Sequence, residues 1–174
     1  MNRKLTAALV AVALALTLTA VAAARGVVTI KGTEKAETLT GTDGADRIYA
    51  GGGDDTVLAG GGNDRAWGGK GDDNLQGGDG NDVLRGRQGN DTIDGGAGND
   101  RIWVGSGADV ENGGDGDDVL HALARDNQVD TIDCGAGNDV VWLNKDENDT
   151  IVNCETVKSV TISAAVSAGV EVDG

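Results

Sequence analysis

Acidic residues recur at every ninth position over most of the chain. The series begins at Glu37, continues without a break to Asp118, and resumes from Asp130 after a short insertion. Carboxylate oxygens are hard, charged ligands, so a regular row of them is suited to holding polyvalent cations of the hard class. The candidate metal ligands are Asp46, Asp55, Asp64, Asp73, Asp82, Asp91, Asp100, Asp109, Asp118 and Asp139.

The elements that position these acids are visible in the same nine-residue register. Residues 68–76 read G-G-K-G-D-D-N-L-Q and residues 77–85 read G-G-D-G-N-D-V-L-R, so the unit is G-G-x-G-x-D-x-U-x, where U is apolar. A three-residue strand x-U-x points U to one side and its neighbours to the other, so the U residues should form a column in the interior. Glycine at positions one, two and four is expected to supply the positive φ of a tight loop.

Composition excludes several classes of function. The chain has 174 residues, 30 Gly, no Pro or Phe, three Trp and one Tyr, and a net charge of −15. This charge argues against nucleic acid and anionic lipid as partners. The single histidine, His121, excludes a His-rich zinc site and an H-E-x-x-H protease helix. We expect no enzymatic activity, because no acid–base pair stands apart from the repeat.

The first 24 residues have the pattern of a secretory signal peptide. Arg3 and Lys4 precede an apolar run from Leu5 to Val21, and residues 22–24 offer a cleavage site of small residues. The alternative is an uncleaved membrane anchor, although the Ala and Thr content makes a weak span. We expect a secreted, extracellular or cell-surface protein that has no membrane contact after signal cleavage.

The nonapeptide unit resembles the RTX, or haemolysin-type, calcium-binding repeat, and the resemblance extends over residues 30–152. It implies an all-β, right-handed parallel β-roll, a two-sheet solenoid with two units, or 18 residues, per turn and about six turns. Several Ca²⁺ ions would lie between its stacked loops. We therefore expect a signal peptide at 1–24, a calcium-binding roll at 25–154 and a C-terminal cap or tail at 155–174.

Calcium is expected to be structural in such a chain. A single apolar column is a thin core, and stacked carboxylates repel one another, so binding and folding should be one event. The alternative is a disordered acidic segment. That alternative does not explain an apolar residue two positions after almost every acid. The sequence therefore predicts a secreted, non-enzymatic calcium-binding module.

One face of the predicted roll is chemically unlike the other. Alternate units share a sheet, and the outward positions seven and nine of one sheet contain every aromatic residue outside the apolar leader. Arg and Trp often anchor interfaces, so this face could bind a polysaccharide or a cell-surface partner. Alternatively, its side chains stiffen the sheet, or the C-terminal segment covers them. The residues are Arg47, Tyr49, Arg65, Trp67, Arg85, Arg101, Trp103, His121 and Trp142.

Three further features depart from the simple repeat. Cys134 and Cys154 lie about one turn apart, which suits a disulfide in an exported chain. Glu111 occupies a U position, so we expect either a bulge that turns Val110 inward, which we favour, or a carboxylate that reaches an edge. The open sheet edges at both ends of the roll could allow end-to-end self-association.

Overall fold

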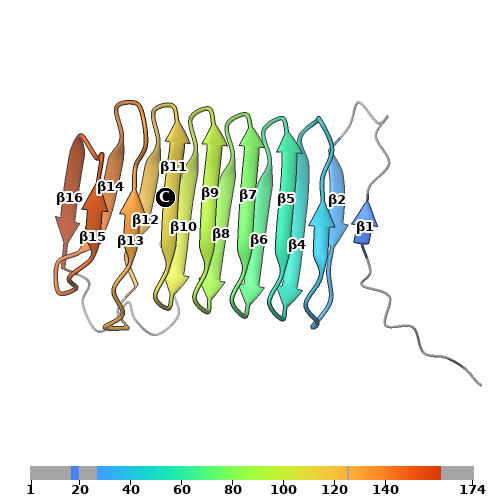
Figure 1. Ribbon diagram of the computed structural model, residues 1–174, viewed down its shortest axis with the longest axis horizontal. Helices are drawn as coiled ribbons and strands as arrows, with labels where there is room; N and C mark the ends of the chain where they lie inside the picture. Colours follow the sequence, from blue (N-terminus) through green and yellow to red (C-terminus); the bar gives the residue numbers. More distant parts are fainter. Residues whose placement is uncertain (1–16, 20–26, 125, 162–174) are drawn as a thin grey trace, which may run out of the picture.

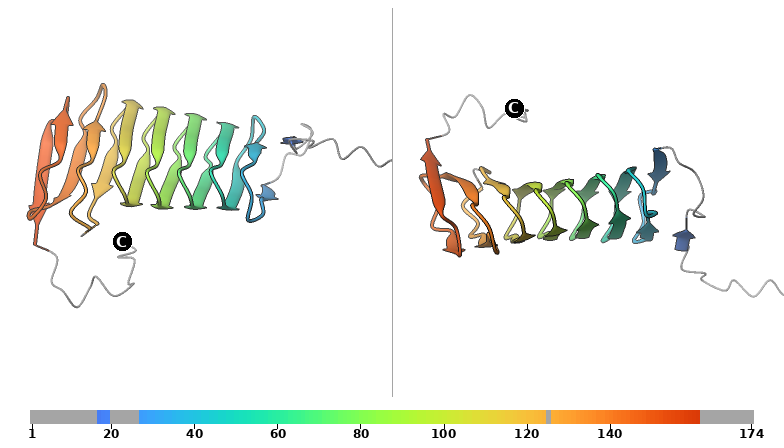
Figure 2. Two further views of the ribbon diagram at one scale, coloured as in Figure 1. Left: turned by 60° about the horizontal axis from the view of Figure 1, so that its bottom comes forward. Right: turned by 90° about the horizontal axis from the view of Figure 1, so that it is seen from above.

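The computed structural model describes residues 17–19, 27–124 and 126–161, and all of their regular structure is β-strand (Figure 1). Two eight-stranded parallel sheets face each other as thin layers (Figure 2). We call them the odd and the even sheet. The odd sheet contains β1 (Thr17–Thr19), β3 (Thr38–Thr40), β5 (Thr56–Gly61), β7 (Asn74–Asp79), β9 (Thr92–Ala97), β11 (Val110–Asp115), β13 (Thr131–Asp133) and β15 (Thr150–Val152). The even sheet contains β2 (Val28–Lys31), β4 (Asp46–Gly52), β6 (Arg65–Lys70), β8 (Val83–Gln88), β10 (Arg101–Ser106), β12 (Val119–Ala122), β14 (Val140–Asn144) and β16 (Thr156–Val160).

The chain alternates between the sheets, so successive strands of one sheet are one turn apart. Residues in the same position of successive turns are separated by 18 residues, as in Asp46 and Asp64. The separation rises to 21 between Asp118 and Asp139 and is 19 between Asp130 and Asp149, which confirms the predicted insertions. The solenoid has about seven turns rather than about six, because the segment after Cys154 adds strand β16.

The core lies between the two sheets, and each sheet contributes one layer of side chains to it. Strand β4 shows strict alternation of buried and exposed residues, as a sheet with one face inward requires. The U residues form one buried column, as predicted. A second buried column, which the sequence reasoning missed, consists of position-one residues such as Ala50, Ala59 and Val104.

The central strands contain six residues rather than the three of x-U-x. Pairing continues into the glycines, where Gly60 lies opposite Gly78 and Gly61 opposite Asp79. Positive φ occurs at positions two and four of the unit, as at Gly78 and Gly80. The prediction of positive φ at position one is wrong, because that residue is part of the strand and faces the core. Glycine is needed there only because a Cβ would collide with neighbouring atoms.

The bulge that we favoured at Glu111 is absent. Glu111 pairs in register with Ile93 and Ile132, so its side chain points into the core and is only 1% exposed. Val110 points outward and is 48% exposed. The ladder is regular on both sides of this residue, and an unbroken ladder leaves no spare residue with which to reverse the pleat.

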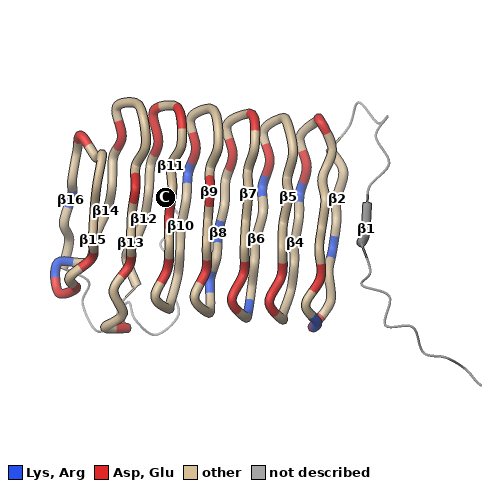
Figure 3. Tube along the Cα trace, in the orientation of Figure 1, with Lys and Arg blue, Asp and Glu red and all other residues tan. Residues whose placement is uncertain are grey.

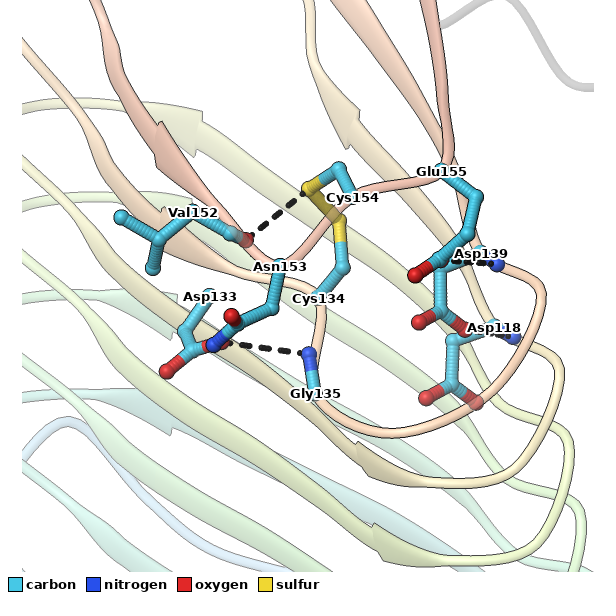
Figure 4. The surroundings of a disulfide bond; sticks show 9 residues. All are labelled: Asp118, Asp133, Cys134, Gly135, Asp139, Val152, Asn153, Cys154 and Glu155. Carbon is cyan, nitrogen blue, oxygen red and sulfur yellow. Dashed lines mark hydrogen bonds between the residues drawn. A yellow bond between two sulfur atoms is a disulfide. The ribbon is translucent and has the colours of Figure 1, made fainter.

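A disulfide joins Cys134 to Cys154, whose Cα atoms are 5.1 Å apart (Figure 4). Beside it, the side-chain amide of Asn153 donates a hydrogen bond to Asp133. The disulfide joins the loop after β13 to the loop after β15, as the one-turn separation predicted.

Most of the predicted signal peptide lies outside the described residues. Its residues 17–19 form strand β1, which pairs with β3 at the edge of the odd sheet. Within the described ranges there is no helix that is long and apolar enough to cross a membrane.

Candidate functional site

The acidic residues of the nine-residue register form two ladders, one along each edge of the roll. Each Asp at position six is buried and opens or immediately precedes a strand. From Asp55 onward, one carboxylate oxygen of each accepts a hydrogen bond from the backbone N–H of the corresponding residue one turn earlier, whereas Asp46 accepts from Thr42 of its own loop. Asp46 donates to Oδ1 of Asp64 at 2.7 Å, and Asp64 donates to Oδ1 of Asp82 at 2.7 Å.

The ladders include acids that we did not count as metal ligands. Glu37 donates its N–H to Asp55 at one end, and Asp139 donates to Oε2 of Glu155 at the other (Figure 4). Asp130 and Asp149 continue the ladder on the other edge. The nine-residue register itself placed Glu37, Asp130 and Asp149, whereas Glu155 falls outside it because the chain is shortened between Asp139 and Glu155.

In every ladder Asp except Asp130, the second carboxylate oxygen is buried and has no hydrogen-bond partner. A buried charged oxygen without a donor is costly, so this repeated arrangement calls for a compensating group. Unpartnered buried oxygens occur on Asp46, Asp55, Asp64, Asp73, Asp82, Asp91, Asp100, Asp109, Asp118, Asp139 and Asp149. All ten predicted ligands are in this set.

In five units, those of Asp73, Asp82, Asp91, Asp100 and Asp118, the unpartnered oxygen faces the position-one glycine of its own unit. A Cβ on Gly95 would lie 2.5 Å from Oδ2 of Asp100 and would collide with the carbonyl oxygen of Gly113, one turn further on. A Cβ on Gly113 would lie 2.6 Å from Oδ2 of Asp118 and would collide with the carbonyl of Cys134. One charged and one carbonyl oxygen, from two consecutive turns, therefore line the same small space. This is the ligand chemistry that Ca²⁺ prefers.

Backbone carbonyls must supply much of any coordination shell. No three side chains of His, Cys, Asp or Glu converge as a metal-binding group in the part of the chain that the structure describes. The ladder residues point one carboxylate into each loop, and a six- to eight-coordinate cation needs more oxygens than that. The tight, Gly-rich loops expose carbonyl groups at close range, which explains why the repeat needs so little side-chain bulk.

Burial and neighbouring charges raise the pKa values of these carboxyl groups. Burial is the largest cause, and the backbone N–H that each carboxylate accepts opposes it. The pKa is raised to about 8 for Asp91, to about 7 for Asp64 and Asp100, and to about 6 for Asp73 and Asp118. Neighbouring acids raise the pKa values further. For Asp73, Asp91 and Asp118 these acids include residues at position five, such as Asp72 and Asp117. A bound cation would remove the cost of keeping these groups ionised.

The candidate sites are not equivalent. In the units of Asp55, Asp64, Asp109 and Asp139, position one carries a side chain, because Ala50, Ala59, Val104 and Cys134 stand there and are buried. Glycine stands at position one in the units of Asp46, Asp73, Asp82, Asp91, Asp100 and Asp118. In the unit of the predicted ligand Asp139, the position-one residue Cys134 takes part in the disulfide.

Position-five side chains make a further ladder on the surface. Asn81 donates its backbone N–H to Oδ1 of Asn63, and Asn99 donates to Oδ1 of Asn81. On the other edge, Asp72 donates to Oδ1 of Asp54. These residues are exposed, but their carbonyl or carboxylate oxygens satisfy the loop backbone of the next turn.

The predicted interaction face lies on the even sheet, where position-nine residues form one continuous column. Tyr49 and Trp67 stack with centroids 4.5 Å apart, and Trp103 and His121 stack at 4.7 Å. The next ring is Trp142, at 6.3 Å from His121. The rings of all three pairs are nearly parallel, with interplanar angles of 2–6°. The rings therefore stand upright from the sheet and cover one another's faces.

Cations complete this column at its centre and at both ends. Arg85 lies over Trp103 at 4.7 Å, and Lys158 Nζ lies over Trp142 at 4.5 Å. Lys31, which was not in the predicted face, lies 5.9 Å from the Tyr49 ring centroid. Burial and the nearby Arg85 and Arg101 charges lower the pKa of His121 to about 4. His121 is consequently a neutral ring in the stack at physiological pH.

The chain belongs to the RTX family. The family model described as RTX calcium-binding nonapeptide repeat (4 copies) matches residues 31–66, 58–93, 67–102, 76–111, 86–120 and 112–151. These overlapping matches extend over the two ladders and most of the solenoid, which confirms the resemblance inferred from the repeat. A search of curated proteins gave no match. The family match supports Ca²⁺ as the ion for which the buried carboxylates are arranged.

Proposed function

We propose that this protein is an exported calcium-binding module that folds as its loops take up Ca²⁺. The observation that carries the proposal is the row of buried carboxylate oxygens without partners. In the units of Asp82, Asp100 and Asp118, this oxygen and a carbonyl oxygen of the next turn lie beside the same glycine. A polypeptide does not retain many buried, unpaired anions without a counter-charge. Ca²⁺ supplies that charge and accepts both kinds of oxygen.

Binding and folding are coupled because the ligands of one site come from two turns. In the unfolded chain Oδ2 of Asp100 and the carbonyl of Gly113 are independent, so the site exists only when the turns stack. Loaded sites then stabilise each other through shared turns, which is the nearest-neighbour behaviour of a solenoid. We therefore expect cooperative uptake of several ions.

The test follows β-structure by circular dichroism while Ca²⁺ is added to chelator-treated protein, with Mg²⁺ as the control cation. The proposal predicts a cooperative gain of β signal at calcium concentrations on the order of 10⁻⁴–10⁻³ M and little response to equal Mg²⁺. A chain that is fully folded in chelator, or that responds equally to both ions, contradicts it.

Two variants compare a substitution inside a candidate site with one outside it. Gly95→Ala introduces a methyl group between Asp100 and Gly113 and should raise the calcium midpoint. Gly44→Ala is the control. A Cβ at Gly44 would contact only the Thr42 hydroxyl oxygen, at 3.9 Å, and the backbone of Gly44 does not have positive φ. Equal calcium midpoints for the two variants would remove Gly95 from the site.

Export is proposed from the sequence of residues 1–24. The disulfide between Cys134 and Cys154 supports it, because such bonds persist in oxidising compartments. N-terminal sequencing of protein recovered from the medium tests the proposal, and cleavage after Ala24 is the expected result. Recovery of uncleaved protein from the membrane fraction would contradict it.

A further inference from the structure

The outer face of the even sheet carries positive charge on an acidic protein. Its position-seven column contains Arg47, Arg65 and Arg101, and its position-nine column contains Lys31, Arg85 and Lys158. Lys and Arg lie along the even strands, whereas Asp and Glu gather mainly where strands meet loops (Figure 3). None of the residues at positions seven and nine of the described even strands is Asp or Glu.

The three arginines of position seven are presented to solvent. Arg47, Arg65 and Arg101 are exposed, and no carboxylate forms an ion pair with any of them within the described ranges. Arg47 and Arg65 lie on adjacent, directly paired strands. Adjacent strands are about 4.8 Å apart, so these side chains form a closely spaced positive row. Such a row is unfavourable in isolation and favourable when an anion lies across it.

The stacked rings of the position-nine column limit the kinds of ligand that this face can bind. Trp103 has Arg85 against its ring on one side and His121 on the other. Tyr49 lies between Lys31 and Trp67. A sugar or a nucleic-acid base cannot stack on faces that are already covered. The column instead presents ring edges and cationic groups, which suit a ligand that carries negative charge and hydroxyl groups.

We infer that the outer face of the even sheet binds an acidic polysaccharide, whose carboxylates pair with Arg47, Arg65 and Arg101 while its sugars lie along the edges of the stacked rings. The three arginines lie on strands β4, β6 and β10 of one sheet, and a row of cations along a sheet fits an extended polymer with repeated negative charges. Single-stranded nucleic acid is disfavoured because its binding depends on stacking bases on open aromatic faces. The net charge of −15 also repels a ligand as densely charged as nucleic acid.

The inference rests on the proposed calcium-dependent fold, because the face exists only when the turns are stacked. Hyaluronan is a suitable probe, and dextran is its uncharged control. Binding is measured for the full chain in calcium buffer by calorimetry at several NaCl concentrations, and circular dichroism on the same samples reports the fold. We expect hyaluronan to bind, with an affinity that falls as salt rises, and dextran not to bind.

The decisive variant is the triple substitution Arg47→Gln, Arg65→Gln, Arg101→Gln. Its matched control is Lys35→Gln, Lys70→Gln, Lys145→Gln, which removes the same charge from exposed loops and strand ends. The first variant should bind hyaluronan about tenfold more weakly, since each exposed ion pair contributes up to about 1 kcal/mol, and the control should bind within about twofold of the unaltered chain.

Each other outcome overturns the inference. Equal loss in both triple variants would show a non-specific charge effect, and binding of poly-glutamate or of single-stranded DNA more tightly than hyaluronan would assign the face to another class of polymer. A chain that folds with calcium but binds no hyaluronan refutes the polysaccharide face alone. A chain that does not fold with calcium refutes the proposed function first.

Discussion

Replacing Glu111 with leucine should stabilise the protein, which is unusual for a change at a fully buried position. Glu111 stands in the apolar column between Ile93 and Ile132, and neither of its carboxyl oxygens has a hydrogen-bond partner. Burial raises the pKa of Glu111 well above its ordinary value, and the charges of Asp130 and Asp109 raise it further, whereas the nearby backbone N–H of His121 opposes the rise only in part. The group is therefore a buried, unsatisfied acid in a site shaped for an aliphatic side chain.

The size of the effect follows from two contributions. Removing an unsatisfied buried polar group recovers about 1–3 kcal/mol. Burying a leucine side chain in its place contributes about 1.5–3 kcal/mol, and leucine is close to glutamate in size. Because some of the second contribution is already made by the methylenes of Glu111, we expect a net gain of about 3 kcal/mol, or roughly 10 °C in Tm for a chain of this length.

Thermal unfolding in saturating calcium, followed by circular dichroism, measures this gain. Glu111→Gln is the matched control, because it keeps the polar atoms and should change Tm by much less than leucine does. Ile93→Glu tests the reciprocal case and should lower Tm by a similar amount. A Tm for Glu111→Leu that is equal to or below that of the unaltered chain would falsify the reasoning and show that the carboxyl group has a partner or a role of its own.

Three further predictions follow from the backbone, the ladders and the disulfide. Arg87 occupies position two with φ of 90°, so Arg87→Gly should raise stability in a thermal melt by about 1 kcal/mol, whereas Arg87→Ala keeps the strain and should give no gain. The raised pKa of Asp91, about 8, and of Asp64, about 7, means that the calcium-free roll binds more protons than the unfolded chain between about pH 4 and pH 8. Its stability therefore falls as pH rises through that window, and circular dichroism in chelator should show more β-structure at pH 5 than at pH 8; the opposite trend refutes this. The double substitution Cys134→Ser, Cys154→Ser opens a cross-link between residues 20 apart, and should cost about 3 kcal/mol of unfolding free energy in denaturant titrations.

The register of the repeat predicted most of the fold because one nine-residue period sets the strands, the inward column and the acid ladders together. Deviations in chain length were also visible, since the insertion after His121 shifts the next acid by three residues. The disulfide followed from the same reasoning, because a fixed turn length places Cys134 next to Cys154.

The remaining features depend on side-chain geometry that a period does not contain. Position one looked like a loop residue because glycine dominates it, but Ala50, Val104 and Cys134 show that it faces the core. The bulge at Glu111 was favoured on the cost of burying a carboxylate, yet the regular pairing on both sides keeps that residue in place. The upright stacking of the rings could not be read from residue types, and it changes which ligands the even sheet can bind.

The direction of the carboxylate ladders has a consequence for how the solenoid is assembled. Each ladder Asp accepts a hydrogen bond from the turn before it. The backbone N–H of Asp82 therefore has this acceptor only after the turn that contains Asp100 has formed. A turn that is synthesised early thus lacks these hydrogen bonds until the next turn has been synthesised and has folded. The final turn is held instead by Glu155 and by the bond between Cys134 and Cys154. We therefore expect nucleation at the C-terminal end and growth toward the N-terminus, opposite to the order of synthesis, so that a chain still emerging stays unfolded until its end is free.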